Sequence, residues 1–349
     1  MFIEGNVKIG SRTKDLVKYL SAEDIAVIQH DDIDELAAEA LLNTNIKAII
    51  NTGRSMTGNY LSKGTTLLYQ NNVYLFDTSL SINDFKEKDL IRIKGKDLII
   101  NNCRFYSNSC IHVNGEYIEQ KRLQAGFLHQ NLLSDFIDNT LQHAMEEKEQ
   151  ILQFESYPKL EMNIKGRPAI VVMRSTESAE DINSLRSYIE SESPILIGVD
   201  GGADAIISCG FVPDILMGDM DSVTELGIYR SREVILHAYP DGRCPCLDRI
   251  EKLNVRYKLL AMPGTSEDIA LLLAGDLGAS SILLIGGNSS MTDFMERGRK
   301  GMGSTLVARL KLGDRLIDYR HIKRLQSFYP ENLQQSYARK AENRLWMKM

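Results

Sequence analysis

The sequence predicts an α/β protein with two domains joined by a long helix. Two segments, residues 1–115 and 161–325, alternate short apolar runs with stretches of helical periodicity. The segment between them contains no proline and a single glycine up to residue 154, which is typical of one long helix. A chain of 349 residues with 43% hydrophobic residues is long and apolar enough for two cores.

The N-terminal domain, residues 1–115, begins a β-α-β unit at "DIAVIQH". "DDIDELAAEALLNT" predicts a helix capped by Asp31 or Asp32, and "IKAIIN" predicts the next strand. "NNVYLFD", "DLIRIKG" and "DLIINN" predict further strands. The loop "NTGRSMTGNY" follows a strand end, and its residues 53–58, together with residues 12–14, are a candidate second anion pocket.

Residues 116–160 are predicted to form an amphipathic connecting helix and a linker. The apolar residues fall near a 3.5-residue spacing among many polar side chains: Phe127, Leu132, Phe136, Leu141 and Met145. Such a seam packs on a neighbour or on a second copy of the helix, and we expect a homodimer. "YPKLEMNIKGRP" reads as the linker.

The second domain, residues 161–325, contains six near-continuous apolar runs, from "AIVVM" to "SILLIGG". Helical patterns such as "SAEDINSLRSYIESES" and "SEDIALLLAGDLGA" separate them. Strands that are apolar on both faces are typical of a parallel sheet with helices on both sides. We therefore expect a doubly wound, mostly parallel sheet, followed by a charged tail at residues 326–349.

Composition excludes several classes of protein. The 41 basic and 47 acidic residues give a net charge of −6, so we expect no nucleic-acid partner. Five cysteines, an odd number without a disulfide framework, predict a cytoplasmic chain. No apolar run reaches the ~20 residues that a membrane helix needs, and the N-terminus lacks the apolar core of a signal peptide.

Polar residues follow two of the predicted strands in the second domain. "VDGGAD" places Asp200 at a strand end, where Gly201 and Gly202 would let backbone amides approach a ligand. "GDMDS" places Asp219 and Asp221 after the next strand, and an extended backbone would turn both carboxylates to one side. Ordinary aspartate turns explain the same pattern, so both readings stay open.

Three further stretches carry candidate phosphate ligands, each with a structural alternative. "PGTSED" opens a helix and reads either as a ligand site or as a capping box from Thr265 to Asp268. "HAYPDGR" holds His237 and Arg243, which either grip phosphate or flank a Pro-Asp-Gly turn. The basic residues of "ERGRKGMGST" either bind phosphate or form a solvated stretch.

Taken together, "DGGAD", "PD", "GDMDS" and the later "SED" resemble the catalytic domain of thiamine pyrophosphokinases. The resemblance implies an Mg²⁺- and ATP-dependent transfer of a pyrophosphoryl group, with Asp219, Asp221 and Asp268 as catalytic residues. It also implies metal ligands and nucleotide-binding residues: Asp200, Asp219 and Asp221 for the metal; Asp200, Gly201, Gly202, Ser222, Thr265, Ser266 and Arg243 for ATP or another nucleoside polyphosphate.

Thiamine itself is not the expected substrate. The family's last motif carries Arg and His, whereas this chain has "GGNSSMTDF", with Phe294 where the His would fall. The family also adds a C-terminal β-domain that completes the thiamine pocket, and only about thirty residues follow Asp318 here.

A longer series of motifs resembles the SteA-type cytokinetic ring proteins of bacteria, among them "SRTKDLVKYLSAEDIAVIQHDDIDELAAEAL", "GVDGGADAI" and "GTSEDIALLLA". Those proteins join an α/β domain to a thiamine-pyrophosphokinase-like domain, act in cell division and often end in a membrane span. The basic tail around Trp346 accordingly predicts a juxtamembrane stub of a membrane-associated division protein. Two functions remain open: an Mg²⁺-dependent nucleotide enzyme, and a catalytically inactive scaffold or sensor at the division site.

Overall fold

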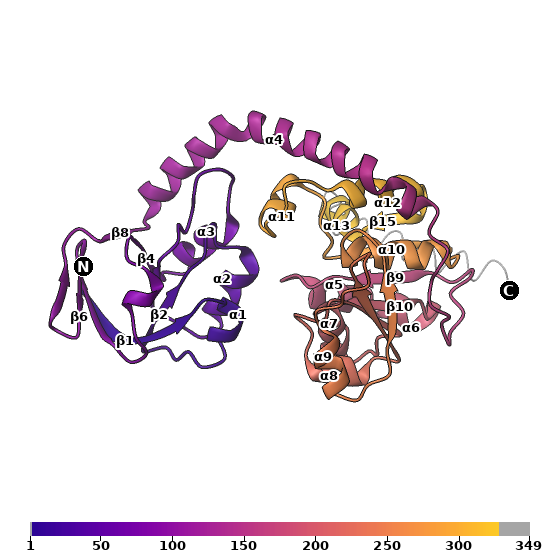
Figure 1. Ribbon diagram of the computed structural model, residues 1–349, viewed down its shortest axis with the longest axis horizontal. Coiled ribbons are helices and arrows are strands. Elements are labelled where there is room, and N and C mark those ends of the chain that lie inside the picture. Colours follow the sequence, from indigo (N-terminus) through magenta and orange to yellow (C-terminus); the bar gives the residue numbers. More distant parts are fainter. Residues whose placement is uncertain (1, 328–349) are drawn as a thin grey trace. The chain divides into compact units, whose positions relative to one another are not determined.

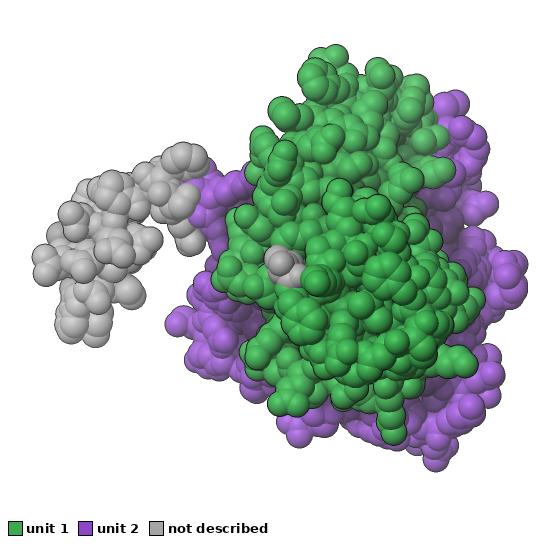
Figure 2. Space-filling view, turned by 90° about the vertical axis from the view of Figure 1, so that its left-hand side faces the viewer, with its two compact units in different colours: residues 1–141, 288–302 green, residues 142–287, 303–349 purple. Residues whose placement is uncertain are grey.

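The computed structural model describes residues 2–327 and divides the chain into two compact units. Unit 1 comprises residues 1–141 and 288–302, and unit 2 comprises residues 142–287 and 303–349 (Figure 2). Unit 1 is therefore discontinuous in sequence, since a segment that follows the sixth strand of unit 2 contributes to it. The sequence patterns predicted two domains but did not indicate that residues 288–302 belong to the first of them.

Unit 1 is built on one mixed sheet with the strand order β7-β6-β5-β1-β2-β3-β4-β8. The four strands from β1 to β4 are parallel to one another, and the other four pair antiparallel. The strands are β1 (Phe2–Gly10), β2 (Asp24–Ile28), β3 (Ala48–Asn51), β4 (Tyr74–Thr78), β5 (Leu90–Lys94), β6 (Asp97–Ile100), β7 (Arg104–Tyr106) and β8 (Cys110–His112). Its helices are α1 (Thr13–Leu16), α2 (Glu35–Leu42), α3 (Lys63–Gln70), η1 (Ile82–Asp84) and α11 (Met291–Met295), with the first part of α4.

The cap of α2 differs from the sequence prediction. Asp34 is the N-cap, and its side chain accepts a hydrogen bond from the amide of Ala37. Asp32 instead has a left-handed backbone, with φ of 51°, and its carboxylate binds the backbone amide and hydroxyl of Thr57. The prediction was wrong because the run of acidic residues offers several equivalent caps, and a loop contact far along the chain takes one of them.

The predicted long helix is present as α4 (Gly115–Leu152), which Figure 1 shows as one unbroken helix. Its apolar residues divide between two faces rather than forming one seam. Phe136 is buried, and its ring lies 6.2 Å from the ring of Phe294 in unit 1. Other large apolar side chains of α4 are exposed: Leu123, Phe127, Leu133, Ile137, Leu141, Met145 and Leu152.

Unit 2 contains a sheet in which every strand is parallel, with the order β13-β12-β11-β10-β9-β14-β15. The strands are β9 (Ala169–Val172), β10 (Ile195–Val199), β11 (Ile215–Gly218), β12 (Glu233–Ala238), β13 (Lys258–Ala261), β14 (Ile282–Ile285) and β15 (Leu316–Asp318). The mixed α/β class with a doubly wound parallel sheet is thus confirmed. Ligands of such sheets bind beyond the carboxyl ends of the strands.

Helices cover both faces of this second sheet. Apolar residues of α10 and α12 pack on one face, and those of α5 to α9 and α13 pack on the other. The helices are α5 (Ser178–Ser184), α6 (Arg186–Glu192), α7 (Gly202–Ser208), α8 (Glu225–Arg230), α9 (Leu247–Lys252), α10 (Ser266–Asp276), α12 (Gly303–Leu312), η2 (Gly313–Arg315) and α13 (Tyr319–Ser327). Burial of both faces explains why the strands read as unbroken apolar runs.

Across residues 2–327, none of the helices combines the length and apolar character needed to cross a bilayer. The basic residues and Trp346 of the predicted juxtamembrane stub lie outside the described residues.

Candidate functional site

The first group of predicted residues lies where β10 and β11 end. These strands are parallel neighbours, with Val199 paired to Met217, so the loops that carry Asp200 and Asp219 leave the sheet side by side. One carboxylate oxygen of Asp200 accepts a hydrogen bond of 2.9 Å from the amide of Met220. Gly218 permits this approach, because a Cβ atom there would lie 2.0 Å from the same oxygen and its φ is +150°.

The loop of residues 219–221, called the acidic loop below, carries charges that act on Asp200. Burial, followed by the charge of Asp219, raises the pKa of Asp200 to about 7, and Asp221 adds to the effect. A carboxylate of Asp219 accepts a 3.0 Å hydrogen bond from the amide of Asp221, which closes the loop on itself. The charges of Asp219 and Asp221 therefore oppose the ionisation of Asp200, and a bound cation would relieve that repulsion.

The two glycines after Asp200 serve the packing of α7. The amide of Gly201 donates to the hydroxyl of Ser222 at 3.2 Å. A Cβ atom on Gly202 would lie 1.9 Å from the carbonyl oxygen of Val172, at the end of β9. Gly202 is thus required for the contact between a helix start and a strand end.

The second group lies at the start of α10. Thr265 and Asp268 form the predicted capping box, and Asp268 is fully buried. Its Oδ2 accepts hydrogen bonds from the amide and hydroxyl of Thr265 and, at 2.7 Å, from the hydroxyl of Ser304 on α12. Its Oδ1 is buried without a hydrogen-bond partner. The capping role therefore occupies one oxygen and leaves the other for a cation or a water.

His237 connects β12 to this second group. Gly218, the last residue of β11, pairs with Leu236, and the next residue, His237, still pairs with Leu260 of β13. Its Nε2 lies 3.0 Å from the carbonyl oxygen of Met262, and its Nδ1 lies 3.1 Å from the hydroxyl of Ser266. Because a carbonyl oxygen only accepts, Nε2 carries a hydrogen, and in the neutral ring Nδ1 is the acceptor for the hydroxyl of Ser266.

The predicted basic residue Arg243 forms an ion pair within its own turn. Arg243 is exposed and donates through Nε to Asp241, 2.6 Å away, and its guanidinium lies over the ring of Tyr239. The "HAYPDGR" stretch is therefore organised as a turn around its own ion pair. The basic residues of "ERGRKGMGST", at positions 297, 299 and 300, belong to unit 1, whereas the acidic groups belong to unit 2.

Sequence reasoning missed three residues of this region. Arg174 is an exposed residue two positions after β9, and its Cδ lies 2.7 Å from where a Cβ of Gly201 would be. Arg249 donates to the carbonyl oxygens of Met220 and Val223 and so holds the acidic loop. Ser304 binds Asp268, as described above. Only Arg174 had a sequence signal, namely its position directly after a buried strand.

The donor atoms of the acidic loop suit a hard cation, but they do not form a complete cage. Within residues 2–327, no three acidic, histidine or cysteine side chains stand close enough together to hold a metal ion by themselves. Mg²⁺ commonly takes one or two carboxylates and fills its other positions with water and phosphate oxygens. The carboxylates of Asp200, Asp219 and Asp221 are oxygen ligands of the kind that such a partly hydrated ion takes.

Three amides of the loop in the candidate anion pocket of unit 1 donate to carboxylates of the protein. The amide of Arg54 donates to Asp31, that of Ser55 to Asp77, and that of Thr57 to Asp32. The loop amides therefore satisfy the protein's own carboxylates. Burial raises the pKa of Asp32 and of Asp77.

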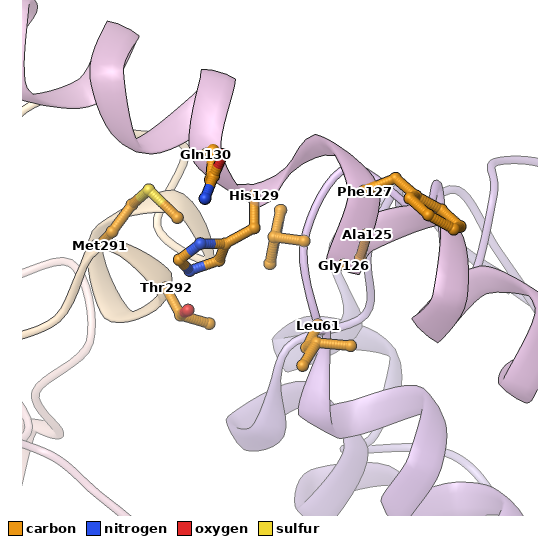
Figure 3. A pocket seen from close by; sticks show the side chains of 9 residues that line it. Leu61, Ala125, Gly126, Phe127, His129, Gln130, Met291 and Thr292 are labelled. Atoms are coloured by element: carbon orange, nitrogen blue, oxygen red, sulfur yellow. The ribbon is translucent and has the colours of Figure 1, made fainter.

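Unit 1 holds a separate pocket of about 540 Å³. Figure 3 shows His129 and Gln130 descending from α4 toward Met291 and Thr292. Burial and nearby carboxylates raise the pKa of Tyr60, which also lines it, above its usual range. The lining is largely apolar and lies in unit 1, so it is distinct from the acidic groups of unit 2: Tyr60, Leu61, Ala125, Gly126, Phe127, His129, Gln130, Met291 and Thr292.

Comparisons with known proteins give weak structural similarities. No protein-family model and no curated protein matches the chain. Thiamine pyrophosphokinase from Bacillus subtilis is 21% identical, with 43% of this chain and 60% of that chain covered and a TM-score of 0.27. A 3-isopropylmalate dehydratase (leuD) from Methanocaldococcus jannaschii is 14% identical, with 35% and 96% covered and a TM-score of 0.23. An uncharacterized protein from Pseudomonas syringae pv. tomato is 12% identical, with 40% and 70% covered and a TM-score of 0.20.

These similarities are low and partial. This chain spans only 60% of the thiamine pyrophosphokinase chain. The chemistry of the site must therefore be argued from the residues of this chain.

The raised pKa of Asp200 predicts a pH dependence of stability. The folded value of about 7 exceeds the unfolded value of about 3.9, so the folded state holds this proton more tightly. The associated stability is present below about pH 4 and is lost as the pH rises to about 7, by at most about 4 kcal/mol. In metal-free buffer, Asp200→Asn should remove this loss and melt higher than the wild type above pH 7. Parallel melting curves for the two proteins from about pH 4 to pH 8 would contradict the assignment.

Proposed function

We propose that unit 2 binds a nucleoside di- or triphosphate together with Mg²⁺ at the carboxyl ends of β10, β11 and β12. The observation that carries the proposal is the raised pKa of Asp200 beside the charges of Asp219 and Asp221, which a divalent cation would neutralise. Carboxyl groups with strongly perturbed pKa values cluster at functional sites.

Each residue has a role in this proposal. Asp200, Asp219 and Asp221 hold the cation, and Asp268 offers its free Oδ1 from the start of α10. The side-chain stem of the exposed Arg174 lies beside Gly201, and this residue supplies positive charge to the phosphates. When bound, Mg²⁺ neutralises phosphate charge and orients the phosphate chain for attack. Arg249 acts indirectly, because it fixes the loop that carries two of the carboxylates.

The proposed reaction class is transfer of a phosphoryl or pyrophosphoryl group, as the name of the thiamine pyrophosphokinase neighbour suggests. Thiamine is not the proposed acceptor, because "GGNSSMTDF" lacks the Arg and His of that family's last motif. Isothermal titration of the wild-type chain with ATP, ADP and GTP, each with Mg²⁺ and with EDTA, tests the binding step. We expect heat only with Mg²⁺, and binding that is equal with and without the metal would refute the site.

The motif resemblance to SteA-type proteins supports a further proposal, that this nucleotide site operates in bacterial cell division on the cytoplasmic side of the membrane. A scaffold or sensor without catalysis is the second candidate. The exposed apolar face of α4 favours it, because such a surface is typical of a protein that works through contacts with other chains.

We also propose that this face joins two copies of the chain. Leu123, Phe127, Ile137 and Leu141 follow the 3- and 4-residue steps of a helix-pairing seam, with polar residues at positions 130 and 134. Leu141→Glu should raise the dimer dissociation constant at least about 10-fold in analytical ultracentrifugation, because it buries a charge in the seam. Asn131→Asp adds a charge at an exposed position off the seam and should leave the dimer intact. Phe136 is unsuitable for this test, because it packs against Phe294 within unit 1.

A wild-type chain that is monomeric at high concentration would contradict the dimer. So would Leu141→Glu and Asn131→Asp variants that dissociate equally.

A further inference from the structure

A serine and a histidine are paired at the edge of the candidate site. Ser266 is the first residue of α10, and its hydroxyl lies 3.1 Å from Nδ1 of His237 at the end of β12. Both residues are partly exposed, so a ligand can reach them. The pairing joins residues 29 positions apart, and neither residue was predicted to act with the other.

The geometry of the pair is that of an activated nucleophile. Nε2 of His237 donates to the carbonyl oxygen of Met262 at 3.0 Å, and this bond fixes both the ring orientation and the tautomer. Nδ1 is thereby left as the acceptor for the serine proton. A hydroxyl, a base within hydrogen-bond reach and a third group that orients the base are the diagnostic features of nucleophilic catalysis.

The surroundings select phosphate as the substrate class. Ser266 opens a helix of 11 residues, whose positive end favours a bound anion. Two residues further, Asp268 holds a buried oxygen without a hydrogen-bond partner, which a phosphate-bound cation would satisfy. The last registered pair of β11 and β12 is Gly218 with Leu236, so Asp219, which we assign to the metal, and His237 each follow a residue of that pair.

We propose that Ser266 is a nucleophile, that His237 is its base, and that Ser266 accepts the terminal phosphoryl group of a nucleoside triphosphate bound in the same chain. The choice of donor rests on the proposed function, whereas the pair itself rests on its own geometry. Oγ of Ser266 forms a bond to the terminal phosphorus as the bond to the bridging oxygen breaks. The electron pair of that bond leaves with the nucleoside diphosphate, and the hydroxyl proton passes to Nδ1 of His237.

The first test measures the nucleophile without any nucleotide. The full chain is treated with an alkyl fluorophosphonate, which esterifies an activated serine and releases fluoride, and labelled peptides are mapped by mass spectrometry. We expect Ser266 to be labelled, and Ser290, a helix N-cap whose hydroxyl accepts from the amide of Asp293, to serve as an unreactive internal control. His237→Gln can keep a donor for Met262 but lacks the base, so the labelling rate should fall about 100-fold.

Melting temperatures of His237→Gln and Ser266→Ala establish that both variants are folded. Labelling of Ser266 no faster than Ser290 in the wild type would overturn the proposal. So would a folded His237→Gln variant that is labelled at the wild-type rate, since the histidine would then be only a structural link.

The second test identifies the donor. The wild type is incubated with ATP and Mg²⁺, and we expect a mass gain of one phosphoryl group that maps to Ser266 and is absent from both variants. If calorimetry shows nucleotide binding but Ser266 stays unmodified, the proposal fails and the nucleotide site stands. If no nucleotide binds, the proposed function is refuted. The assignment of a nucleoside triphosphate as the donor is then refuted too, even if the fluorophosphonate labels Ser266.

Discussion

Asp219→Asn is expected to weaken the binding of Mg²⁺–nucleotide about 100-fold or more. Asparagine keeps the size of the side chain and an oxygen for the amide of Asp221, but it removes the charge that would bind the cation. A 100-fold loss of affinity corresponds to about 2.8 kcal/mol, at about 1.4 kcal/mol for each tenfold change. Titration calorimetry of both proteins with ATP and Mg²⁺ measures it. Asp248→Asn, an exposed aspartate at the start of α9, is the control with the same change of charge.

The same variant should be at least as stable as the wild type when no metal is present. Removing the charge of Asp219 removes one cause of the raised pKa of Asp200. If Asp219→Asn binds nucleotide as tightly as the wild type, the metal-binding role is contradicted and the aspartates are turn residues. A variant that unfolds would make Asp219 structural.

Among the glycine-to-alanine substitutions in unit 2, Gly202→Ala is expected to be the most destabilising. The new Cβ would lie 1.9 Å from the carbonyl oxygen of Val172, a backbone atom in a central strand that cannot move aside cheaply. Overpacking of this kind costs about 1–3 kcal/mol and occasionally more, and a contact this short lies at the upper end. Urea denaturation with tryptophan-independent detection, such as circular dichroism, would show a lower midpoint.

Gly126→Ala is the matched control for that substitution. Gly126 is also helical, and nothing lies within 4 Å of the position that its Cβ would take. Alanine is favoured over glycine in a helix interior by about 0.5–1 kcal/mol, so this variant should be slightly more stable than the wild type. Equal effects from the two substitutions would show that the contact with Val172 is not tight.

The sequence predicted the parallel sheet of unit 2 because its strands are buried on both faces and lack polar alternation. Short apolar runs bounded by glycine or proline, such as residues 195–199, are typical of buried strands. It also predicted which residues follow β10 and β11, because strand ends are marked by the change from apolar to acidic residues. Local composition was sufficient for these features.

Features that depend on contacts distant in sequence were not predictable in the same way. The pairing of Ser266 with His237, and of Ser304 with Asp268, arises from how α10 and α12 meet the sheet. The two faces of α4 were merged into one seam, because periodicity shows that a residue is apolar but not which neighbour covers it. Phe136 is covered by Phe294, a residue 158 positions later in the chain.

The discontinuity of unit 1 has a consequence for the order in which the protein can fold during synthesis. Its last segment, residues 288–302, leaves the ribosome only after β9 to β14 of unit 2 have been made. Until then Phe136 lacks the ring of Phe294, and Thr140 lacks the amide of Met302 that binds its hydroxyl. Until residues 288–302 are made, the nascent N-terminal unit must therefore expose the apolar side chain of Phe136 on α4. Chaperones bind exposed apolar surface of this kind.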